Sequence, residues 1–388
     1  MRIVPPVLKI LMLNYEFPPI GGGAGQAHLC LLKEFAGNSE LQIDVLTSAP
    51  EPGYVVDEFA GNINIYKVGV HKKNLHHWRK IEVLEWLYKA NKFYKRLLKQ
   101  NDYDFVHAFF GFPTGWLCYR TANKLPYIIS LRGSDVPGKH ARLAIDYKIL
   151  GPLFKLIWGK ASALVACSEG LKERSLRFLP IAVIDVIPNG VDTERFSPAQ
   201  NKDRNDTFKL LTAGRLSVTK RVEMLIDAVE ILHKAGMKIS FTIVGGGAGK
   251  GLLRQIISAK KLDAVIKVAG RIEAEKMPEV YRQNDLFISA SMQEGMSNAM
   301  LEAMASGLPI VTTRCEGVEE LIGDNGVIVE NDSALSIADA VKKAASDTDE
   351  YDAMCAAARK KSEQFNWSNV GRGYLQIYRR VMNKHSSN

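Results

Sequence analysis

Residues 289–313, SASMQEGMSNAMLEAMASGLPIVTT, run from the end of one predicted strand through a helix to the next predicted strand. A predicted strand ends near Ala290, and Ser297 is suited to cap the following helix because its hydroxyl can accept a hydrogen bond from the first helical turn. The helix is predicted to run to Ser306, and Gly307 supplies its C-terminal stop before the next strand. A strand, a helix and a second strand in this order indicate an α/β fold built on parallel strands.

Short apolar runs rich in β-branched residues alternate with helical patterns along the chain. Such nearly continuous runs are typical of parallel strands buried on both faces of a sheet, so the alternation predicts βαβ units. In the first half, the predicted strands are Leu8–Leu13, Ile43–Thr47, Ile63–Val68, Phe105–Ala108, Tyr127–Leu131, Leu164–Cys167 and Val183–Ile187. In the second half, they are Leu210–Ala213, Ser240–Val244, Ala264–Val268, Leu286–Ala290, Ile310–Thr313 and Gly326–Val329.

The length of 388 residues favours two domains, since domains usually contain roughly 100–200 residues. The segment Phe196–Thr207 is polar and has no apolar periodicity, so it is predicted to be a linker. Near the end of the chain, Asn369–Lys384 has the pattern of an amphipathic helix. The predicted division is residues 1–195, a linker at 196–207, residues 208–366 and a C-terminal helical segment at 367–388.

The formal net charge of +9 is uneven: residues 1–195 carry 25 Lys and Arg against 18 Asp and Glu, whereas residues 196–388 carry 26 against 24. The sequence has no recognisable nucleic-acid motif, so the basic half favours an anionic membrane surface or a lipid-linked acceptor as partner. A solvated basic surface without a partner is an equally good interpretation. Two basic patterns, 89–99 and 147–160, fit membrane-facing helices, but core-facing helices with lysines on their wet side are the preferred interpretation.

The cysteines and the N-terminal segment bear on location. Five cysteines are widely spaced and form no C-x-x-C pair, which suits a reducing cytosol better than a disulfide framework or a zinc site. The apolar run Met1–Leu13 is broken by Pro5 and Pro6, so it is predicted to hold a first buried strand rather than a signal peptide. We predict a cytoplasmic protein, and a peripheral contact at the inner face of the membrane stays open.

Two glycine-rich loops are present, Gly21–Gly23 and Gly245–Gly247. Neither loop matches the G-x-G-x-x-G dinucleotide fingerprint or the P-loop, which disfavours nicotinamide enzymes and nucleoside triphosphatases. The first loop follows the strand Leu8–Leu13 and precedes a helical run, Gln26–Phe35. Backbone N–H groups at such a helix start suit a phosphate, although a flexible turn would have the same composition.

The loop and helix within residues 289–313 carry the most specific chemistry. Glu294 lies in the loop, where it can reach a sugar, and Glu302 lies within the helix, where it can accept two hydrogen bonds from a ribose diol. Backbone N–H groups at the helix start suit a diphosphate. The residues that supply them are Gly295, Met296, Ser297, Asn298 and Ala299.

A pair of cations follows the first strand of the second half. Arg215 comes directly after that strand, and Lys220 is predicted to begin the next helix. A cation in the first helical turn is unfavourable unless an anion is bound there, so both side chains are predicted to converge on one anion. A solvated Lys–Arg turn is the alternative.

Together these residues resemble glycosyltransferase family 4, the retaining "glycosyl transferases group 1" type with the GT-B fold. The resemblance implies two Rossmann-like, doubly wound domains with parallel sheets that face one another across a cleft, the acceptor on the first domain and the nucleotide-sugar on the second. The motifs that carry it are Pro18-Pro19 with Gly21-Gly22-Gly23, Pro188-Asn189-Gly190-Val191-Asp192, Gly214-Arg215 with Lys220, Val244-Gly245, and Glu294 with Glu302.

The resemblance also implies residue roles. Arg215 and Lys220 would bind the diphosphate and stabilise the leaving group in place of a metal, so neither a metal nor a cofactor is expected. Glu302 would hold the ribose, and Glu294 and the backbone of residues 295–299 would hold the sugar. The base would lie near Arg271, and Gly22 and Gly23 would meet the phosphates from across the cleft. The catalytic candidates are Arg215, Lys220 and Glu294, and the final helix would return to the first domain.

The implied activity is a retaining hexosyl transfer from a UDP- or GDP-sugar to a glycan or glycolipid acceptor, in surface polysaccharide or glycoconjugate synthesis. One departure concerns the acceptor side, where family members often have a His-Gly pair after the strand Tyr127–Leu131. This chain has Arg132 there, and a guanidinium cannot act as a general base. Arg132, Asp135 and His107 are the candidates for the acceptor or sugar pocket.

Two alternatives to a transferase stay open. A nucleotide-sugar epimerase or hydrolase on the same scaffold would need a positioned acid and base, and only Asp135 and His107 are available if they converge. A binding protein without catalysis is disfavoured, because Arg215, Lys220, Glu294 and Glu302 are all present.

Overall fold

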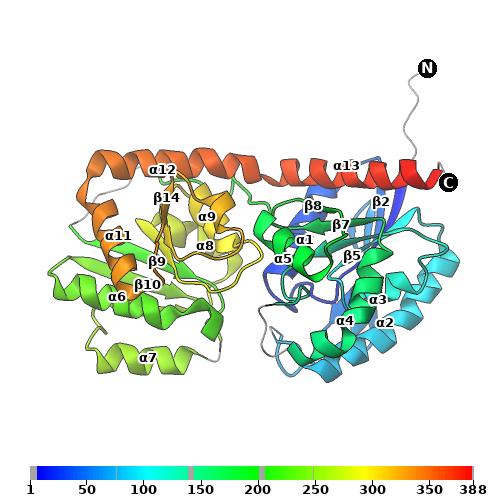
Figure 1. The fold of residues 1–388 in the computed structure, drawn as a ribbon, viewed down its shortest axis with the longest axis horizontal. Helices are drawn as coiled ribbons and strands as arrows, with labels where there is room; N and C mark the ends of the chain where they lie inside the picture. Colours follow the sequence, from blue (N-terminus) through cyan, green and yellow to red (C-terminus); the bar gives the residue numbers. More distant parts are fainter. Residues whose placement is uncertain (1–6, 76, 139–143, 201–205, 248, 387–388) are drawn as a thin grey trace, which may run out of the picture. The chain divides into compact units, whose positions relative to one another are not determined.

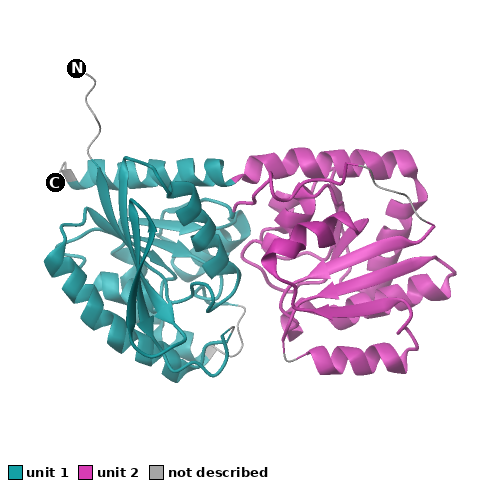
Figure 2. Ribbon diagram, turned by 180° about the vertical axis from the view of Figure 1, so that it is seen from behind, with its two compact units in different colours: residues 1–189, 367–388 teal, residues 190–366 magenta. Residues whose placement is uncertain are grey.

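The computed structural model describes residues 7–75, 77–138, 144–200, 206–247 and 249–386. It divides into two compact units (Figure 2): unit 1 holds residues 1–189 with 367–388, and unit 2 holds residues 190–366. The predicted boundary at residue 195 falls inside unit 2, because Val191 already donates its backbone N–H to the Phe365 carbonyl of that unit at 2.7 Å. Residues 201–205 of the predicted linker and residues 387–388 lie outside the described residues.

Unit 1 is built on an eight-stranded sheet with the order β3-β4-β2-β1-β5-β6-β7-β8 (Figure 1). Its strands are β1 (Leu8–Leu13), β2 (Leu41–Ala49), β3 (Tyr54–Ala60), β4 (Ile63–Gly69), β5 (Phe105–Phe109), β6 (Tyr127–Leu131), β7 (Ala163–Ala166) and β8 (Ile184–Val186). Its helices are α1 (Gly23–Phe35), α2 (Lys80–Gln100), α3 (Thr114–Tyr119), α4 (Ala144–Gly159), α5 (Glu169–Phe178) and α13 (Trp367–Ser386).

Strand β3 is the element that the sequence analysis missed. It pairs antiparallel with β4 at the edge of the sheet, whereas the other described strand pairs of this sheet are parallel. No residue of β3 is fully buried, and Val55 and Val56 are exposed. An edge strand that is not buried on both faces lacks the continuous apolar run by which the other strands were recognised.

Unit 2 is built on a six-stranded parallel sheet with the order β11-β10-β9-β12-β13-β14. Its strands are β9 (Phe208–Ala213), β10 (Ile239–Val244), β11 (Ile266–Gly270), β12 (Leu286–Ser289), β13 (Ile310–Thr312) and β14 (Gly326–Ile328). Its helices are η2 (Val218–Lys220), α6 (Val222–Lys234), α7 (Lys250–Ala259), η3 (Ala274–Lys276), α8 (Met277–Arg282), α9 (Asn298–Ala305), α10 (Val318–Leu321), α11 (Ala334–Ser346), α12 (Thr348–Ser362) and η4 (Glu363–Phe365).

The core of unit 2 explains why its strands were readable from the sequence. The inner residues of β9 and β10, such as Leu210 and Phe241, are fully buried and pack against the apolar stripe of α6 that includes Ile226 and Val229. At α9 the Ser297 hydroxyl accepts the Met300 N–H at 3.4 Å, as expected for the predicted cap. The prediction of two parallel-sheet α/β domains is confirmed.

The last helix, α13, belongs to unit 1 although unit 2 lies between it and the rest of unit 1 in the sequence. It packs along α1, and its buried face consists of Val370, Tyr374, Ile377, Tyr378 and Val381. These are the residues that the amphipathic pattern of Asn369–Lys384 placed on one face. No helix in the described ranges combines the length and the hydropathy that a membrane span requires.

Candidate functional site

The loops that follow the parallel strands of unit 2 all emerge at one edge of its sheet, because parallel strands share a direction. Strand β9 lies between β10 and β12, so the order of connection reverses beside β9. In open α/β sheets, ligands bind at the carboxyl ends of the strands at such a reversal. The loops after β9 and β12 therefore frame the candidate donor site, and they contain Arg215, Lys220 and Glu294.

Lys220 and Glu294 meet at this edge. The Lys220 Nζ forms an ion pair with Glu294 Oε1, and both side chains are mostly buried. The backbone holds the two loops together as well, because the Met292 N–H donates to the Thr219 carbonyl at 2.8 Å. The sequence pattern predicts Lys220 in the first turn of a helix, but it ends the short helix η2, and α6 begins two residues later.

Arg215 differs from Lys220 in its surroundings. It lies between the left-handed Gly214 and the buried Leu216, and its side chain is exposed. Within the part of the chain that the structure describes, its guanidinium has no hydrogen bond or ion pair. A cation without a protein partner beside an ion-paired lysine gives this edge of the sheet the charge to hold an anion.

Arg221 is a residue that sequence reasoning missed. It adopts a left-handed conformation with φ of 45° just before α6, which is unusual for a side chain of its size. Its guanidinium donates to the Ala290 carbonyl at 2.6 Å and to the Thr313 hydroxyl at 3.1 Å, and it pairs with Asp332 at 2.8 Å. One side chain thus ties the loop that carries Lys220 to the ends of β12 and β13. Only its position next to Lys220 could have drawn attention to it.

On the other side of β9, the glycine-rich loop after β10 packs directly on the backbone of the β9 loop. The Leu216 N–H donates to the Gly246 carbonyl at 2.9 Å, and the Gly245 N–H donates to the Gly270 carbonyl at 2.8 Å. A Cβ atom on Gly245 would lie 1.7 Å from the Gly214 carbonyl oxygen, and φ of Gly245 is 143°. Glycine is required at position 245 by this contact, whatever else the loop binds. The exposed Arg271 follows Gly270 at the same edge.

Helix α9 presents its N-terminus at this edge. Gly295 lies in the loop before it, and Asn298 and Ala299 form its first turn, where the helix dipole favours an anion. The side chains of Met296 and Ser297 are buried, so only their backbone can face a ligand.

Glu302 lies on the same helix in a distinctive environment. Burial raises the pKa of Glu302 to about 7, although the Tyr281 hydroxyl donates to its carboxylate at 2.8 Å and the charge of Arg195 acts in the opposite direction. Arg195 lies over the Phe196 ring, which in turn packs edge-on against Tyr281. The half-buried carboxylate is thereby held in one orientation.

In unit 1 the corresponding reversal of strand order lies between β1 and β5. Gly22 caps α1 and Gly23 is its first residue, directly after β1 and its loop. The Gly21 N–H donates to the Leu75 carbonyl at 2.7 Å, which fixes the glycine loop to the loop between β4 and α2.

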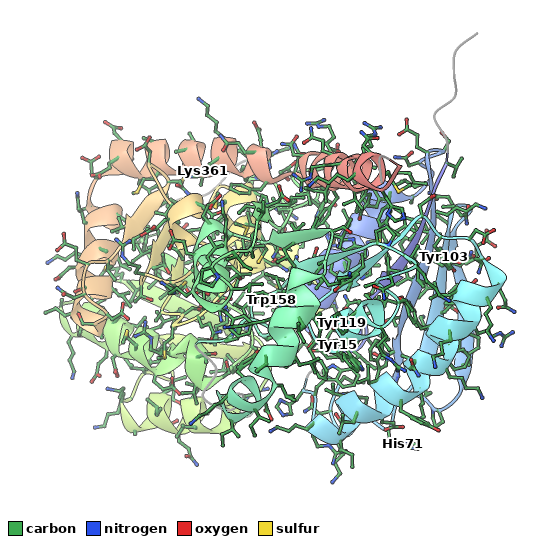
Figure 3. The ribbon with its side chains drawn as sticks, turned by 45° about the vertical axis from the view of Figure 1, so that its right-hand side comes forward. Tyr15, His71, Tyr103, Tyr119, Trp158 and Lys361 are labelled. Carbon is green, nitrogen blue, oxygen red and sulfur yellow. The ribbon has the colours of Figure 1, made fainter. Side chains whose placement is uncertain are left out.

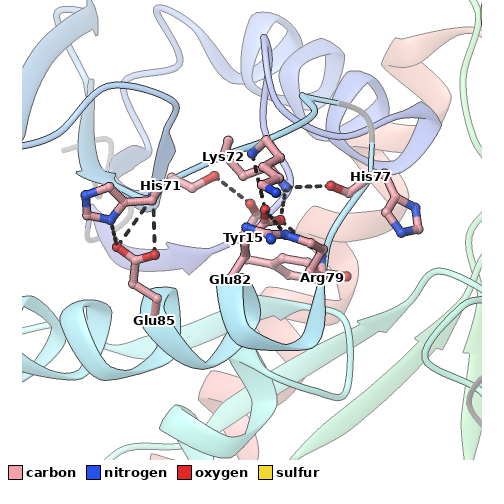
Figure 4. A network of polar contacts seen from close by, with 9 residues as sticks. Tyr15, His71, Lys72, His77, Arg79, Glu82 and Glu85 are labelled. Atoms are coloured by element: carbon pink, nitrogen blue, oxygen red, sulfur yellow. Dashed lines mark hydrogen bonds and ion pairs between the residues drawn. The ribbon is translucent and has the colours of Figure 1, made fainter.

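The loop between β4 and α2 is itself held by a buried ion pair (Figure 4). Lys72 Nζ lies 2.8 Å from Glu82 Oε2, 2.7 Å from the His77 carbonyl and 3.8 Å from the centre of the Trp78 ring. Burial opposes ionisation of Glu82, but hydrogen bonds from Lys72 and Arg79 outweigh it and lower its pKa to about 2. Nothing in the sequence pattern indicated this anchor.

Arg132 and Asp135 lie in the loop after β6. The Asp135 carboxylate accepts the backbone N–H groups of Arg132 at 2.8 Å and Gly111 at 2.7 Å, so it joins the loops after β5 and β6. Burial raises its pKa. The Arg132 guanidinium donates to Asn189 Oδ1 at 2.6 Å.

His107 is not available to a substrate, which corrects its assignment to the acceptor pocket. Its side chain is fully buried within β5, Nδ1 contacts the Tyr378 hydroxyl at 2.8 Å and Nε2 contacts the Ser130 hydroxyl at 2.8 Å. Burial, together with the charge of Arg132, lowers its pKa to about 3. Because both ring nitrogens are occupied by residues of β6 and α13, His107 acts in the packing of α13.

Among the described residues, no group of three or more His, Cys, Asp or Glu side chains is arranged to hold a metal ion. The candidate groups of unit 2 are therefore cations, backbone N–H groups and single carboxylates. Tyr15, Tyr119 and Trp158, which Figure 3 labels in unit 1, belong to its aromatic packing rather than to this edge.

Known families match both halves of the chain. The family described as Glycosyltransferase Family 4 matches residues 21–195, and the family described as Glycosyl transferases group 1 matches residues 207–347. An uncharacterized glycosyltransferase of Methanocaldococcus jannaschii is 24% identical over 403 residues, which cover 97% of this chain and 99% of that protein. A subunit of the phosphatidylinositol N-acetylglucosaminyltransferase of Arabidopsis thaliana is 23% identical over 392 residues, which cover 97% and 83%.

Solved structures show the same fold. Sucrose-phosphate synthase from Thermosynechococcus elongatus superposes with a TM-score of 0.82 at 18% identity and covers 97% of this chain and 100% of its own. HepE of Anabaena, in complex with UDP and glucose, superposes with a TM-score of 0.72 at 18% identity and covers 96% and 100%.

Proposed function

Because the chain belongs to the family 4, group 1 glycosyltransferases, we propose that it moves a sugar from a UDP- or GDP-sugar to a glycan or glycolipid acceptor, with retention of the anomeric configuration and without a metal ion. One observation supports the proposal: Lys220 and Glu294 form an ion pair between the loops that follow β9 and β12, beside the reversal point of the unit 2 sheet, and Arg215 lies in the same loop as Lys220. Similar proteins support the substrate classes, since HepE was solved with UDP and glucose and the Arabidopsis relative is named for transfer to phosphatidylinositol.

In this proposal, Arg215 and Lys220 stabilise the charge that develops on the leaving diphosphate, the task that a metal performs in other transferases. Glu294 pairs with Lys220 when no donor is bound. When the diphosphate of the donor binds Lys220 instead, the Glu294 carboxylate turns to the sugar hydroxyls. The first turn of α9 meets the phosphates, and Glu302 holds the ribose. In unit 1, the backbone of Gly22 and Gly23 at the start of α1 is suited to a phosphate, and Arg132 serves the acceptor or an anionic sugar.

The epimerase or hydrolase alternative loses its best acid–base pair. His107 is fully buried, with both ring nitrogens bonded, and burial lowers its pKa to about 3. Asp135 is occupied by two backbone N–H groups. Since His107 is committed to the interior, Asp135 and His107 do not form an acid–base pair for a sugar.

The first test follows nucleotide release from a panel of UDP-, GDP- and ADP-sugars with and without a lipid acceptor. Arg215→Ala and Lys220→Ala should each lower kcat by about a hundredfold or more, the scale of losing one charge-stabilising group. Lys238→Ala is the matched control, because this exposed lysine precedes β10 at the opposite edge of the sheet. Near-normal turnover in both site variants would overturn the assignment of the leaving-group cations.

The same assay separates the remaining alternatives. Addition of EDTA should leave the rate unchanged, and strict dependence on a divalent ion would contradict the metal-independent step. Product with the donor's anomeric configuration supports retention. Epimerised sugar nucleotide without transfer indicates the alternative enzyme class, and tight donor binding without turnover indicates a binding protein.

A further inference from the structure

Two helices of unit 1 carry large apolar side chains on their outer faces. Ile81, Leu84 and Tyr88 follow one another on α2 at helical spacing, and Ile145 and Ile149 do so on α4. Ile81, Tyr88, Ile145 and Ile149 are 69, 84, 70 and 70% exposed. These side chains contribute nothing to the core, because the inner faces of the same helices supply it with Trp86 and Trp158, which are buried.

The two outer faces belong to one surface. Helix α3 packs against both α2 and α4, so the three helices form one layer over the sheet (Figure 1). At their N-terminal ends, α2 and α4 are joined directly by an ion pair of 2.8 Å between Lys80 and Asp146. The exposed side chains of both helices therefore point away from the sheet on the same side of unit 1. We call this surface the α2–α4 face; its apolar residues are Ile81, Leu84, Tyr88, Ile145, Ile149 and Leu156.

The charge on the α2–α4 face has one sign. The acids of both helices are paired locally. Glu82 pairs with Lys72 and Arg79 (Figure 4). Glu85 pairs with Lys89, and Asp146 pairs with Lys80. The exposed bases of the two helices are not balanced by further acids on them; they are Lys92, Lys95, Arg96, Lys99, Lys148 and Lys155.

Unit 1 as a whole has the same bias. It contains 28 Lys and Arg against 16 Asp and Glu, whereas unit 2 contains 23 against 26. A second copy of this chain would place like charges opposite one another on this face, which disfavours a symmetric dimer through it. An anionic lipid surface offers phosphates to the lysines and acyl chains to the isoleucines at the same time.

We propose that the α2–α4 face docks unit 1 on an anionic lipid bilayer, with Ile145, Ile149, Ile81 and Tyr88 inserted at the interface and the surrounding lysines at the lipid phosphates. The docking requires no bound donor and no catalysis, so it stands apart from the proposed reaction. Its consequence for that reaction is to bring the enzyme to the surface where a lipid-linked acceptor is found.

The test is flotation of the full chain with vesicles of phosphatidylcholine alone or with roughly 30% phosphatidylglycerol, at low and at high salt. The protein should float with the anionic vesicles, and salt should weaken the binding. The double variant Ile145→Ser/Ile149→Ser should bind at least about tenfold more weakly, as expected for loss of two inserted aliphatic side chains. Lys95→Glu/Lys148→Glu should show a loss of similar size that salt largely removes.

Matched controls distinguish binding through this face from nonspecific binding through other exposed residues. Ile181→Ser/Val183→Ser removes aliphatic side chains that are 88 and 83% exposed elsewhere on unit 1, and Lys342→Glu/Lys343→Glu reverses two exposed charges of unit 2. Both controls should bind vesicles as the unaltered chain does. Equal losses in the controls and the face variants would overturn the proposal, as would no binding to anionic vesicles.

Two further measurements test whether a second copy of the chain covers the face and whether docking is independent of the reaction. If sedimentation equilibrium shows a dimer that Ile145→Ser/Ile149→Ser dissociates, the occupant of the face is a second copy and the bilayer proposal is wrong. Nucleotide release from the donor sugar, measured without vesicles, should be the same in the face variants and the unaltered chain. If the unaltered chain releases no nucleotide, the proposed reaction is contradicted, whereas the proposed membrane docking is still tested by the vesicle experiment.

Discussion

At the scale of single residues, the environment of a side chain determines its chemistry more than its type. Glu294 and Glu302 are separated by one loop and one helical turn, yet Glu294 pairs with a lysine and Glu302 faces a tyrosine hydroxyl. Burial raises the pKa of Glu302 to about 7. The two carboxylates, which look alike in the sequence, are thus prepared for different partners.

The raised pKa of Glu302 predicts a pH-dependent stability. Between about pH 4.5 and 7 the folded protein keeps a proton on Glu302 that the unfolded chain has lost, so the free energy of unfolding should fall as the pH rises through this window. Relative to Glu302→Gln, the unaltered chain should lose on the order of 1–3 kcal/mol between about pH 5 and pH 8. Urea unfolding at several pH values, with Glu279→Gln on the exposed side of α8 as control, measures this difference. Parallel pH profiles of the unaltered chain and Glu302→Gln would contradict it.

At the scale of elements, the candidate donor site includes two loops, after β9 and after β10, that touch through their backbones. Gly245→Ala would place a methyl group 1.7 Å from the Gly214 carbonyl, in a backbone conformation that L-residues rarely adopt. Gly246→Ala is the matched control, because a Cβ atom there has no neighbour within 4 Å.

The expected result for Gly245→Ala is a displaced β9 loop and loss of donor binding. Because Arg215 and Lys220 follow Gly214 in that loop, the apparent affinity for UDP or GDP should fall by at least about tenfold, the equivalent of 1.4 kcal/mol. Isothermal titration with the nucleotides compares both variants. Equal affinities in Gly245→Ala and Gly246→Ala would show that the loop contact does not position the cations.

The elements that could be predicted from the sequence share one physical property. Strands such as β1 and β6 are buried on both faces of the sheet. Such strands consist almost entirely of apolar residues, and this continuous run makes them recognisable in the sequence. Strand β3 is an exposed edge and left no such run. The Ser297 cap and the glycine stop after α9 could also be predicted, because a helix cap depends only on the residues next to the helix end.

Features that depend on tertiary contacts were not readable. His107 looks like a strand-end histidine in the sequence, and only the return of Tyr378 on α13, 271 positions later, shows that its ring is committed to packing. Arg221 precedes α6, but its three partners are distant in the sequence. They are the Ala290 carbonyl after β12, the Thr313 hydroxyl after β13, and Asp332. No local pattern encodes contacts between segments so far apart.

At the scale of the whole chain, the two units differ in connectivity. Unit 2 is one continuous segment whose ends meet: Val191 pairs with Asn366, and the Arg359 guanidinium donates to the carbonyls of Thr193 and Phe196 near the start. Unit 1 is interrupted, because α13 arrives only after unit 2 has been completed. The chain therefore closes unit 2 within one continuous segment, whereas unit 1 is completed only by α13 near the end of the sequence.

This difference predicts that fragment 190–366 folds on its own and that fragment 1–189 does not. Helix α13 contributes five buried side chains, namely Val370, Tyr374, Ile377, Tyr378 and Val381. At about 1.5–3 kcal/mol each, their burial amounts to roughly 10 kcal/mol, which is comparable with the total stability of a domain. Without α13, His107 also loses the hydroxyl that partners its Nδ1. Fragment 190–366 should unfold cooperatively on heating and bind UDP or GDP, whereas fragment 1–189 should show no cooperative transition until residues 367–388 are fused back to it. A cooperative transition of 1–189 near that of the full chain would mean that α13 is an accessory to unit 1 rather than part of its core.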